Sequence, residues 1–283
     1  MARIEVTSVH AQRQGESAWV EVEHVSEAEL ADIRRALAKQ VKVEREVADA
    51  VANSFVYAVQ QCPLANPSDV WQHVIYRGML LLGYTDQQWK RISGFALERA
   101  LTIIYSPHLA QFGLRMRALA GKEAHELIAK LGLSGQIKRD KIDRIVEVSR
   151  EPDWHLVAGI HVKASLAERI QDDVPASLAL MSKGILSIML TMDSKSFPPP
   201  HGNGVNYGEL GGRNWGADAD RDMIKRQYVE DDGQFDAMIS YNLRTPPSEG
   251  ETKSGKRIYT LSFAEPQPDV LVSMLKERAD AIR

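Results

Sequence analysis

The sequence predicts an α/β protein with a mainly helical first part, residues 1–132, and a mixed-sheet second part, residues 133–283. Up to about residue 132, apolar side chains recur with the 3.6-residue period of amphipathic helices. After about residue 140 the pattern changes to that of strands. With 283 residues and 44% apolar side chains, the chain can build the packed core of a single domain.

Composition narrows the class of protein further. The sequence contains no run of 18 apolar residues, and its first twenty residues mix charged and polar groups, so we expect neither a membrane span nor a signal peptide. Cys62 is the single cysteine, which excludes an internal disulfide and fits a cytoplasmic location. The net charge of −3 argues against nucleic-acid binding only weakly, because a local basic cluster is enough to bind phosphate.

The first part opens with alternating apolar and polar residues, IEVTSVH and AWVEVEHV, which predict a short hairpin. Two helix starts carry a capping box, in which Ser or Thr is followed three residues later by Glu or Gln. The expected helices begin at Ser26, Val47, Pro67 and Thr85, the last of them ending at Ser106-Pro107, and a further helical stretch covers residues 109–132.

The second part contains the predicted sheet. The segments KIDRIVEV and WHLVAGIHVKAS predict two strands, and a helix should follow over 166–183, with Asp172 and Asp173 as cap candidates before Pro175. The apolar run of residues 185–192 predicts a central strand that is covered on both faces. Residues 194–233 predict a long functional loop with a short helix inside it, and FDAMISYNL, RIYTLSF and a helix from Pro268 complete the fold.

Two polar residues stand in this apolar frame where packing does not require them, Asp153 and Lys163. Neighbouring strands lie about 4.8 Å apart, so a tight connection would bring this carboxylate and ammonium together. Strand alternation places Lys163 and His161 on one face, with Ile160 and Val162 on the other. A carboxylate that holds a hard cation, beside a lysine that serves water and phosphate, is suited to phosphodiester hydrolysis.

Pro152-Asp153, seven residues and then His161-Val162-Lys163 resembles the PD-(D/E)XK signature of type II restriction endonucleases. The resemblance implies a restriction-endonuclease-like core, Mg²⁺ as cofactor and cleavage of double-stranded DNA to leave 5′-phosphates. His161 occupies the position that is usually acidic, so the second carboxylate must come from elsewhere. We expect His161 to fill space in the strand or to support a neighbouring ligand.

The resemblance extends to the subgroup that cuts CCGG-containing or CCNGG sites, in which an upstream helix supplies this carboxylate from the pattern Ser-Gly-x-x-x-Glu. The sequence has Ser93-Gly94-Phe95-Ala96-Leu97-Glu98. Glu98 is therefore implied as a catalytic residue with Asp153 and Lys163, and as the second metal ligand with Asp153. Gly94 lies one helical turn before Glu98 and leaves room for the metal and the DNA backbone.

The same resemblance implies base-reading residues after the lysine. Glu168 and Arg169 would read a C·G pair, because Glu accepts from cytosine N4 and Arg donates to guanine O6 and N7. Ala167 replaces the first Arg of the fuller pattern, which leaves the target sequence open. Asp173 and Arg213 complete the residues expected at DNA. The late basic residues Arg213, Arg221, Lys225 and Arg226 either clamp phosphate or form a solvated helix face.

Each candidate residue also has an explanation that involves no function. Asp153 could belong to a simple turn, and Lys163 to the solvated face of an edge strand. Glu98 could be a surface carboxylate of a helix, and Glu168-Arg169 an ordinary pattern of charges at a helix start.

The function that fits these patterns is sequence-specific cleavage of duplex DNA by a homodimer, with pairing of dimers into tetramers left open. No nucleotide cofactor is expected, because the sequence lacks a P-loop. Two alternatives remain: a repair or recombination nuclease with the same core, and a non-catalytic protein that binds DNA or a protein partner.

Overall fold

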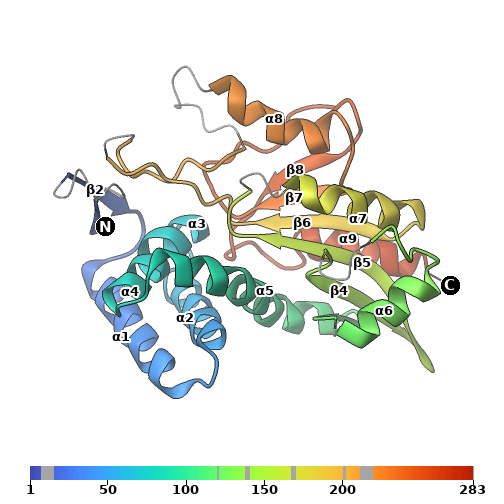
Figure 1. The fold of residues 1–283 in the computed structure, drawn as a ribbon, viewed down its shortest axis with the longest axis horizontal. Coiled ribbons are helices and arrows are strands. Elements are labelled where there is room, and N and C mark those ends of the chain that lie inside the picture. Colours follow the sequence, from blue (N-terminus) through green and yellow to red (C-terminus); the bar gives the residue numbers. More distant parts are fainter. Residues whose placement is uncertain are drawn as a thin grey trace.

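A computed structural model describes residues 1–7, 16–119, 121–137, 141–166, 170–199, 202–210 and 219–282, with the backbone alone for 219–224. Its centre is a mixed sheet with helices on both faces (Figure 1). In the described chain this sheet has six strands, in the spatial order β3 (Leu114–Arg117), β4 (Arg144–Arg150), β5 (Asp153–Lys163), β6 (Leu186–Thr191), β7 (Ala237–Ser240) and β8 (Arg257–Thr260).

The helical first part follows the sequence prediction closely. Strands β1 (Ala2–Thr7) and β2 (Ser17–Val22) pair antiparallel as the expected hairpin. Both predicted capping boxes are present, at Ser26 and at Thr85. The helices of this part are α1 (Glu27–Val43), α2 (Val47–Gln61), α3 (Pro67–Asp69), the π-helical η2 (Val70–Ile75), α4 (Tyr76–Leu81) and α5 (Asp86–Ala110). None of the helices within the described residues is long and apolar enough to cross a membrane.

Two boundary predictions are wrong. Helix α5 continues through Pro107 to Ala110 instead of ending at Ser106. Proline removes one hydrogen bond to the carbonyl four residues earlier, and Ile103 is exposed, so water can satisfy that carbonyl. The second error is the expected helix over 109–132, because α5 ends at Ala110, β3 follows it and the chain becomes helical again only in α6 (Gly121–Lys130).

Pairing with β4 explains why β3 is a strand. Leu114 and Met116 are buried, while Arg115 and Arg117 both form ion pairs with Glu147 of β4, at 2.9 and 2.8 Å. Four residues give a period-2 signal too short to recognise in the sequence, and tertiary contacts override helix propensity here.

The topology of the sheet determines where β5 ends. β4 runs antiparallel to β5, whereas β5, β6, β7 and β8 are parallel to one another. The carboxyl ends of these parallel strands therefore share one edge, and β5 ends there at Lys163. The prediction of a central strand at 185–192 is confirmed, since β6 lies between β5 and β7.

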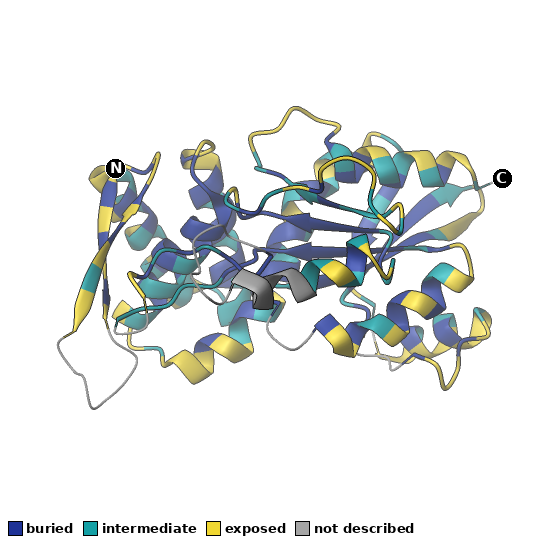
Figure 2. Ribbon diagram, turned by 90° about the horizontal axis from the view of Figure 1, so that it is seen from above, coloured by how far each residue is buried: buried dark blue, intermediate teal, exposed yellow. Residues whose placement is uncertain are grey.

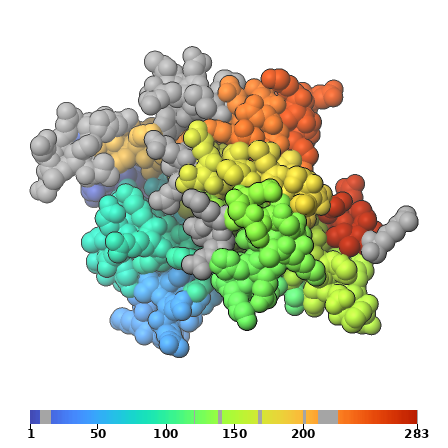
Figure 3. All heavy atoms as spheres, turned by 45° about the vertical axis from the view of Figure 1, so that its right-hand side comes forward, coloured from blue at the N-terminus to red at the C-terminus, as the bar shows by residue number. Residues whose placement is uncertain are grey.

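Different helices cover the two faces of the sheet. Ile160 and Val162 of β5 pack with α5 and with α9 (Val270–Asp280), and Lys163 points to the other face, toward α7 (Ile170–Ser182). This confirms the predicted alternation along β5. Figure 2 shows the strands buried between the helices, and Figure 3 shows α6 beside α7 on the face of the molecule that it presents. Because β5 is an inner strand, Lys163 does not lie on a solvated edge.

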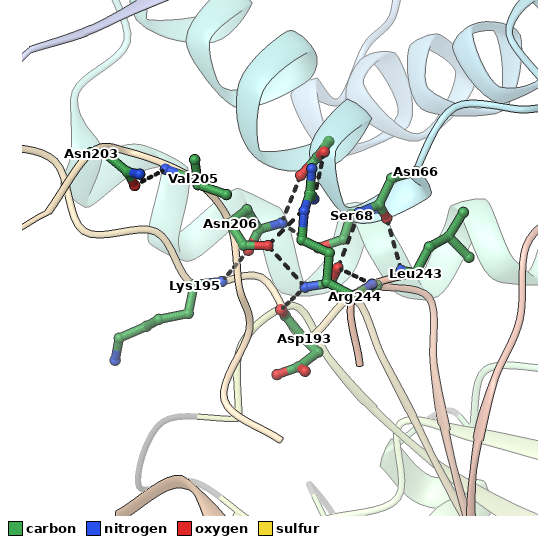
Figure 4. A network of polar contacts seen from close by, with 11 residues as sticks. Asn66, Ser68, Asp193, Lys195, Asn203, Val205, Asn206, Leu243 and Arg244 are labelled. Carbon is green, nitrogen blue, oxygen red and sulfur yellow. Dashed lines mark hydrogen bonds and ion pairs between the residues drawn. The ribbon is translucent and has the colours of Figure 1, made fainter. Parts of the chain in front are cut away.

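A network of polar side chains joins the helical part to the loops that follow β6 and β7 (Figure 4). Arg244 Nη1 pairs with Asp69 Oδ2 at 2.7 Å, and Asn206 Nδ2 donates to Asp69 Oδ1 at 3.3 Å. Asn66 Nδ2 donates to Asn242 Oδ1 at 3.0 Å. Buried polar groups need such partners, so this network fixes the loops at the carboxyl edge of the sheet relative to the helices.

We predict that Gly208→Ala destabilises the protein more than Gly250→Ala. Both glycines have positive φ, 78° and 57°, so each alanine costs about 1 kcal/mol of backbone strain. A Cβ at Gly208 would also lie 2.3 Å from the carboxylate of buried Asp193, whereas a Cβ at Gly250 meets nothing within 4 Å. We expect this overpacking to add about 1–3 kcal/mol to the loss in urea unfolding experiments. Equal losses for the two variants would contradict the close approach.

Candidate active site

The predicted convergence of Asp153 and Lys163 is wrong. The two residues are the first and last of the same strand, β5, and ten residues of extended chain separate them by about 30 Å. Asp153 is exposed and lies opposite Arg150 in the register of β4 and β5, beside the hairpin turn and at the opposite end of β5 from Lys163. The prediction failed because the turn comes before Asp153, so the nine intervening residues run along one strand and do not fold back.

Asp143 takes the position that Asp153 was expected to hold. It directly precedes β4, and its Oδ2 accepts hydrogen bonds from the Val162 backbone N–H at 2.7 Å and from Lys163 Nζ at 3.3 Å. Its own N–H donates to the Ile160 carbonyl at 3.1 Å. Two adjacent strands therefore bring a carboxylate and a lysine together, as expected, but with a different aspartate. The sequence contained a signal for Asp143, because it is an acidic residue directly before the first strand of an antiparallel hairpin. In such a hairpin, the start of the first strand lies beside the end of the second.

Lys163 is held between two carboxylates. Besides Asp143, its Nζ pairs with Asp173 Oδ2 of α7 at 2.7 Å. Burial alone would lower the pKa of Lys163, but the charges and hydrogen bonds of Asp143 and Asp173 outweigh it and raise this pKa above the ordinary value. The ammonium is thus charged and fixed in direction.

Asp173 was expected to contact DNA, and the structure places it elsewhere. Its side chain is 2% exposed and faces Lys163, so it cannot reach a base without leaving its ion pair. Burial raises the pKa of Asp173, and Lys163 offsets part of this rise. The structure therefore favours Asp173 as a residue that positions Lys163.

Glu98 reaches the same end of β5 from α5. Its Oε2 forms an ion pair with Arg144 Nη1 at 3.0 Å, and Glu98 is 9% exposed. Glu98 is therefore not an ordinary carboxylate on the surface of a helix. Burial and the negative charge of Asp143 raise the pKa of Glu98 to about 7, although Arg144 and Lys163 counteract this. A Cβ placed on Gly94 would meet nothing within 4 Å, which agrees with open space one turn before Glu98.

His161 fills the interior instead of facing the open edge. It is fully buried, with Nε2 3.1 Å from Ser187 Oγ and Nδ1 3.9 Å from Asp173 Oδ2. Burial lowers the pKa of His161 to about 4, so the ring is neutral near pH 7. This placement agrees with a residue that supports the Asp173–Lys163 pair.

The carboxylates of Glu98 and Asp143 suit a hard divalent cation. The two negative charges repel each other, which contributes to the raised pKa of Glu98, and a cation between them would relieve this repulsion. Within the ranges that the structure describes, no group of three or more His, Cys, Asp or Glu side chains could hold a metal. Two carboxylates suit a divalent cation that takes water and phosphate oxygens as its other ligands.

Several predicted DNA contacts lie outside the described residues, namely Glu168, Arg169 and Arg213. Of the late basic residues, Arg226 pairs with Glu230 at 2.6 Å and donates to the carbonyls of Leu210 and Pro246. These contacts of Arg226 connect α8 (Ala219–Glu230) to the loops that contain Leu210 and Pro246.

Comparison with known proteins connects this geometry to a family. No protein-family model matches the chain. The chain is 43% identical over 258 residues to the type II restriction enzyme AgeI of Thalassovita gelatinovora, covering 87% of this chain and 90% of that enzyme. It also resembles the crystal structure of the specific AgeI–DNA complex, with a TM-score of 0.86, 39% identity and coverage of 98% and 99% of the two chains. The chain belongs to the family of type II restriction enzymes, which are site-specific deoxyribonucleases.

Proposed function

We propose that the protein is a sequence-specific, Mg²⁺-dependent endonuclease of double-stranded DNA that leaves 5′-phosphates. The observation that carries the proposal is the convergence of Glu98, Asp143 and Lys163 at the carboxyl end of β5. Restriction endonucleases of this family generally use divalent metal ions, and AgeI has been crystallised with DNA. The non-catalytic alternative explains this arrangement less well, because it gives no role to a largely buried lysine held between two carboxylates. A repair nuclease would share the arrangement, and the similarity to a type II restriction enzyme favours sequence-specific cleavage over it.

The residues would divide the reaction between them. Asp143 and Glu98 would hold the cation, which when bound offsets charge on the phosphorus-centred transition state and makes its water more acidic. Lys163 Nζ would orient the attacking water and donate to a nonbridging oxygen of the scissile phosphate. Asp173 would keep this ammonium charged and correctly directed. The water oxygen would bond to phosphorus as the P–O3′ bond breaks, so the phosphate would stay on the 5′ end. The water would release its proton to solvent, and the leaving 3′ oxygen would take one from solvent.

A CCGG-containing target is the most specific expectation. The test is digestion of plasmids that each carry one palindromic NCCGGN sequence, with Mg²⁺ and with EDTA. Discrete bands from one class of plasmid, absent in EDTA, are the expected result. Smears or cuts at junctions would favour a repair nuclease, and binding without cleavage of any plasmid would favour a non-catalytic protein.

Glu98→Gln should reduce cleavage strongly while leaving the fold intact. The amide keeps the size of the side chain and can still contact Arg144, but it loses the negative charge that we assign to cation binding. We expect a loss of about a hundredfold or more in kcat, partly restored by raising the Mg²⁺ concentration. A matched control is Glu277→Gln on α9, which should cut at the wild-type rate. Full activity of Glu98→Gln at low Mg²⁺ would remove Glu98 from the site.

We also propose a homodimer on DNA, because a two-fold protein matches a palindrome and places one active site on each strand. Analytical ultracentrifugation with a palindromic duplex should give two protein chains per duplex. A species with four chains and two duplexes would indicate paired dimers. Monomers both with and without DNA would remove this proposal.

A further inference from the structure

A second charged cluster lies beside the candidate active site and has no part in the reaction described above. The segment after β6 runs along the end of β5, with the Met192 N–H donating to the Lys163 carbonyl at 3.1 Å and the Ser194 N–H to the Ala164 carbonyl at 2.9 Å. Lys195 follows directly. The loop after β6 therefore carries a lysine past the end of the strand that bears Lys163.

Glu209 is the centre of this cluster. Its Oε1 lies 3.0 Å from Lys195 Nζ and 2.7 Å from Lys225 Nζ of α8 (Ala219–Glu230), and its Oε2 accepts from Ser165 Oγ at 2.9 Å. The glutamate side chain is 4% exposed, whereas the side chains of Lys195 and Lys225 are 35% and 19% exposed. A buried carboxylate thus holds two partly accessible ammoniums, and its hydrogen bond from Ser165 links it to the chain two residues beyond Lys163.

Lys195 is anchored at both ends. Its backbone N–H donates to Asn206 Oδ1 at 2.7 Å, inside the polar network, and its side chain points away from that network (Figure 4). Its Nζ lies 5.4 Å from the centre of the Phe197 ring, which further limits its directions. Such a fixed lysine loses little side-chain entropy when it binds a ligand.

The charges of the cluster favour an anion. Among the side chains that the structure describes here, two ammoniums contact the same oxygen of one carboxylate, and those ammoniums repel each other. Asp193, which accepts a hydrogen bond from the Glu209 backbone N–H at 2.6 Å, is fully buried behind it and is shared with Thr245. A phosphate oxygen placed between the two lysines would stabilise them both.

We propose that Lys195 and Lys225, held by Glu209, bind a DNA backbone phosphate that neighbours the scissile one. Lys195 comes from the loop after β6 and Lys225 from α8, so one phosphate would tie both segments to the active-site edge of the sheet. This inference rests on the proposed function and adds a residue-level DNA contact to it. Because phosphate contacts carry no sequence information, these lysines would strengthen binding to every duplex equally.

The test measures binding, without divalent metal, to a duplex that contains the cleaved sequence and to the same duplex with that sequence scrambled. Lys195→Met and Lys225→Met should each weaken binding to both duplexes by the same factor, about tenfold. Each should also reduce the slope of log Kd against log salt concentration by about 0.9. Lys276→Met is the matched control, since Lys276 also pairs with an acid, Asp280, but lies on α9 near Phe112, away from this edge. It should bind like wild type.

Glu209→Gln separates a phosphate site from a purely structural cluster. Removal of its negative charge should leave binding unweakened, or strengthen it, and keep the salt slope at or above that of wild type. If the cluster only stabilises the fold, all three variants weaken binding alike and lower the melting temperature. Wild-type salt slopes in Lys195→Met and Lys225→Met, or equal weakening by all three variants, would overturn the inference. A wild-type protein that cuts no DNA would instead refute the proposed function itself.

Discussion

Lys163→Met should abolish DNA cleavage, with a loss of at least about a thousandfold in kcat, while binding to the target duplex remains. The substitution keeps the length of the side chain but removes the charge that we place at the scissile phosphate, and the loss of one such donor commonly costs a hundred- to a thousandfold. Plasmid cleavage under single-turnover conditions, together with a gel-shift assay in EDTA, measures the two effects separately.

Two further variants control this experiment. Lys163→Met also leaves Asp143 and Asp173 without the cation between them, so its melting temperature must be measured as well. Lys163→Arg keeps a positive charge there and should fold like wild type, yet remain impaired because its planar group cannot reproduce the position of Nζ. Lys183→Met, at an exposed site just after α7, should cut normally. Wild-type cleavage by Lys163→Met would exclude lysine chemistry at this site.

Asp143→Asn and Asp153→Asn should have opposite outcomes. Asp143→Asn retains a carbonyl oxygen for the Val162 N–H, so the strand end should stay folded, but it loses the charge assigned to the cation. We expect at least about a thousandfold loss of cleavage. Asp153→Asn changes an exposed residue at the far end of β5 and should cut at the wild-type rate.

This pair of variants shows which aspartate takes part in cleavage: Asp143, which lies beside Lys163, or Asp153, which belongs to the Pro-Asp pair of the sequence signature. Circular dichroism and melting curves show whether either variant has lost its fold. An inactive Asp153→Asn together with a fully active Asp143→Asn would exclude Asp143 as the catalytic carboxylate, because the Pro-Asp pair would then be part of the reaction despite its distance from Lys163.

The sequence was informative where local chemistry determines structure. The capping boxes at Ser26 and Thr85 correctly predicted two helix starts, and the unbroken apolar run of residues 185–192 predicted the inner strand β6. Alternation along 160–163 assigned Lys163 to the correct face. The resemblance to restriction endonucleases led to Glu98, which does lie near Lys163.

The sequence failed where strand register decides. A Pro-Asp pair beside a strand looks the same whether it lies at the active edge or at the opposite turn, and only the pairing of β4 with β5 distinguishes the two. That pairing places Asp143 at the end of β5 and Asp153 at its start. Asp173 shows a related limit, because a helix-start acid that would suit DNA is instead buried against Lys163. The cluster at Glu209 joins three segments that are distant in sequence, and no local pattern predicts it.

We propose that Glu98 and Asp143, and not Asp153, hold the cation beside Lys163. The most direct test is a crystal structure of the protein with duplex DNA and Mn²⁺, in which anomalous scattering locates the ion. We predict an anomalous peak in contact with the carboxylates of Asp143 and Glu98, next to a DNA phosphate and Lys163. A peak bound by Asp153, or an ion at the phosphate with neither Asp143 nor Glu98 as a ligand, would rule out this metal site.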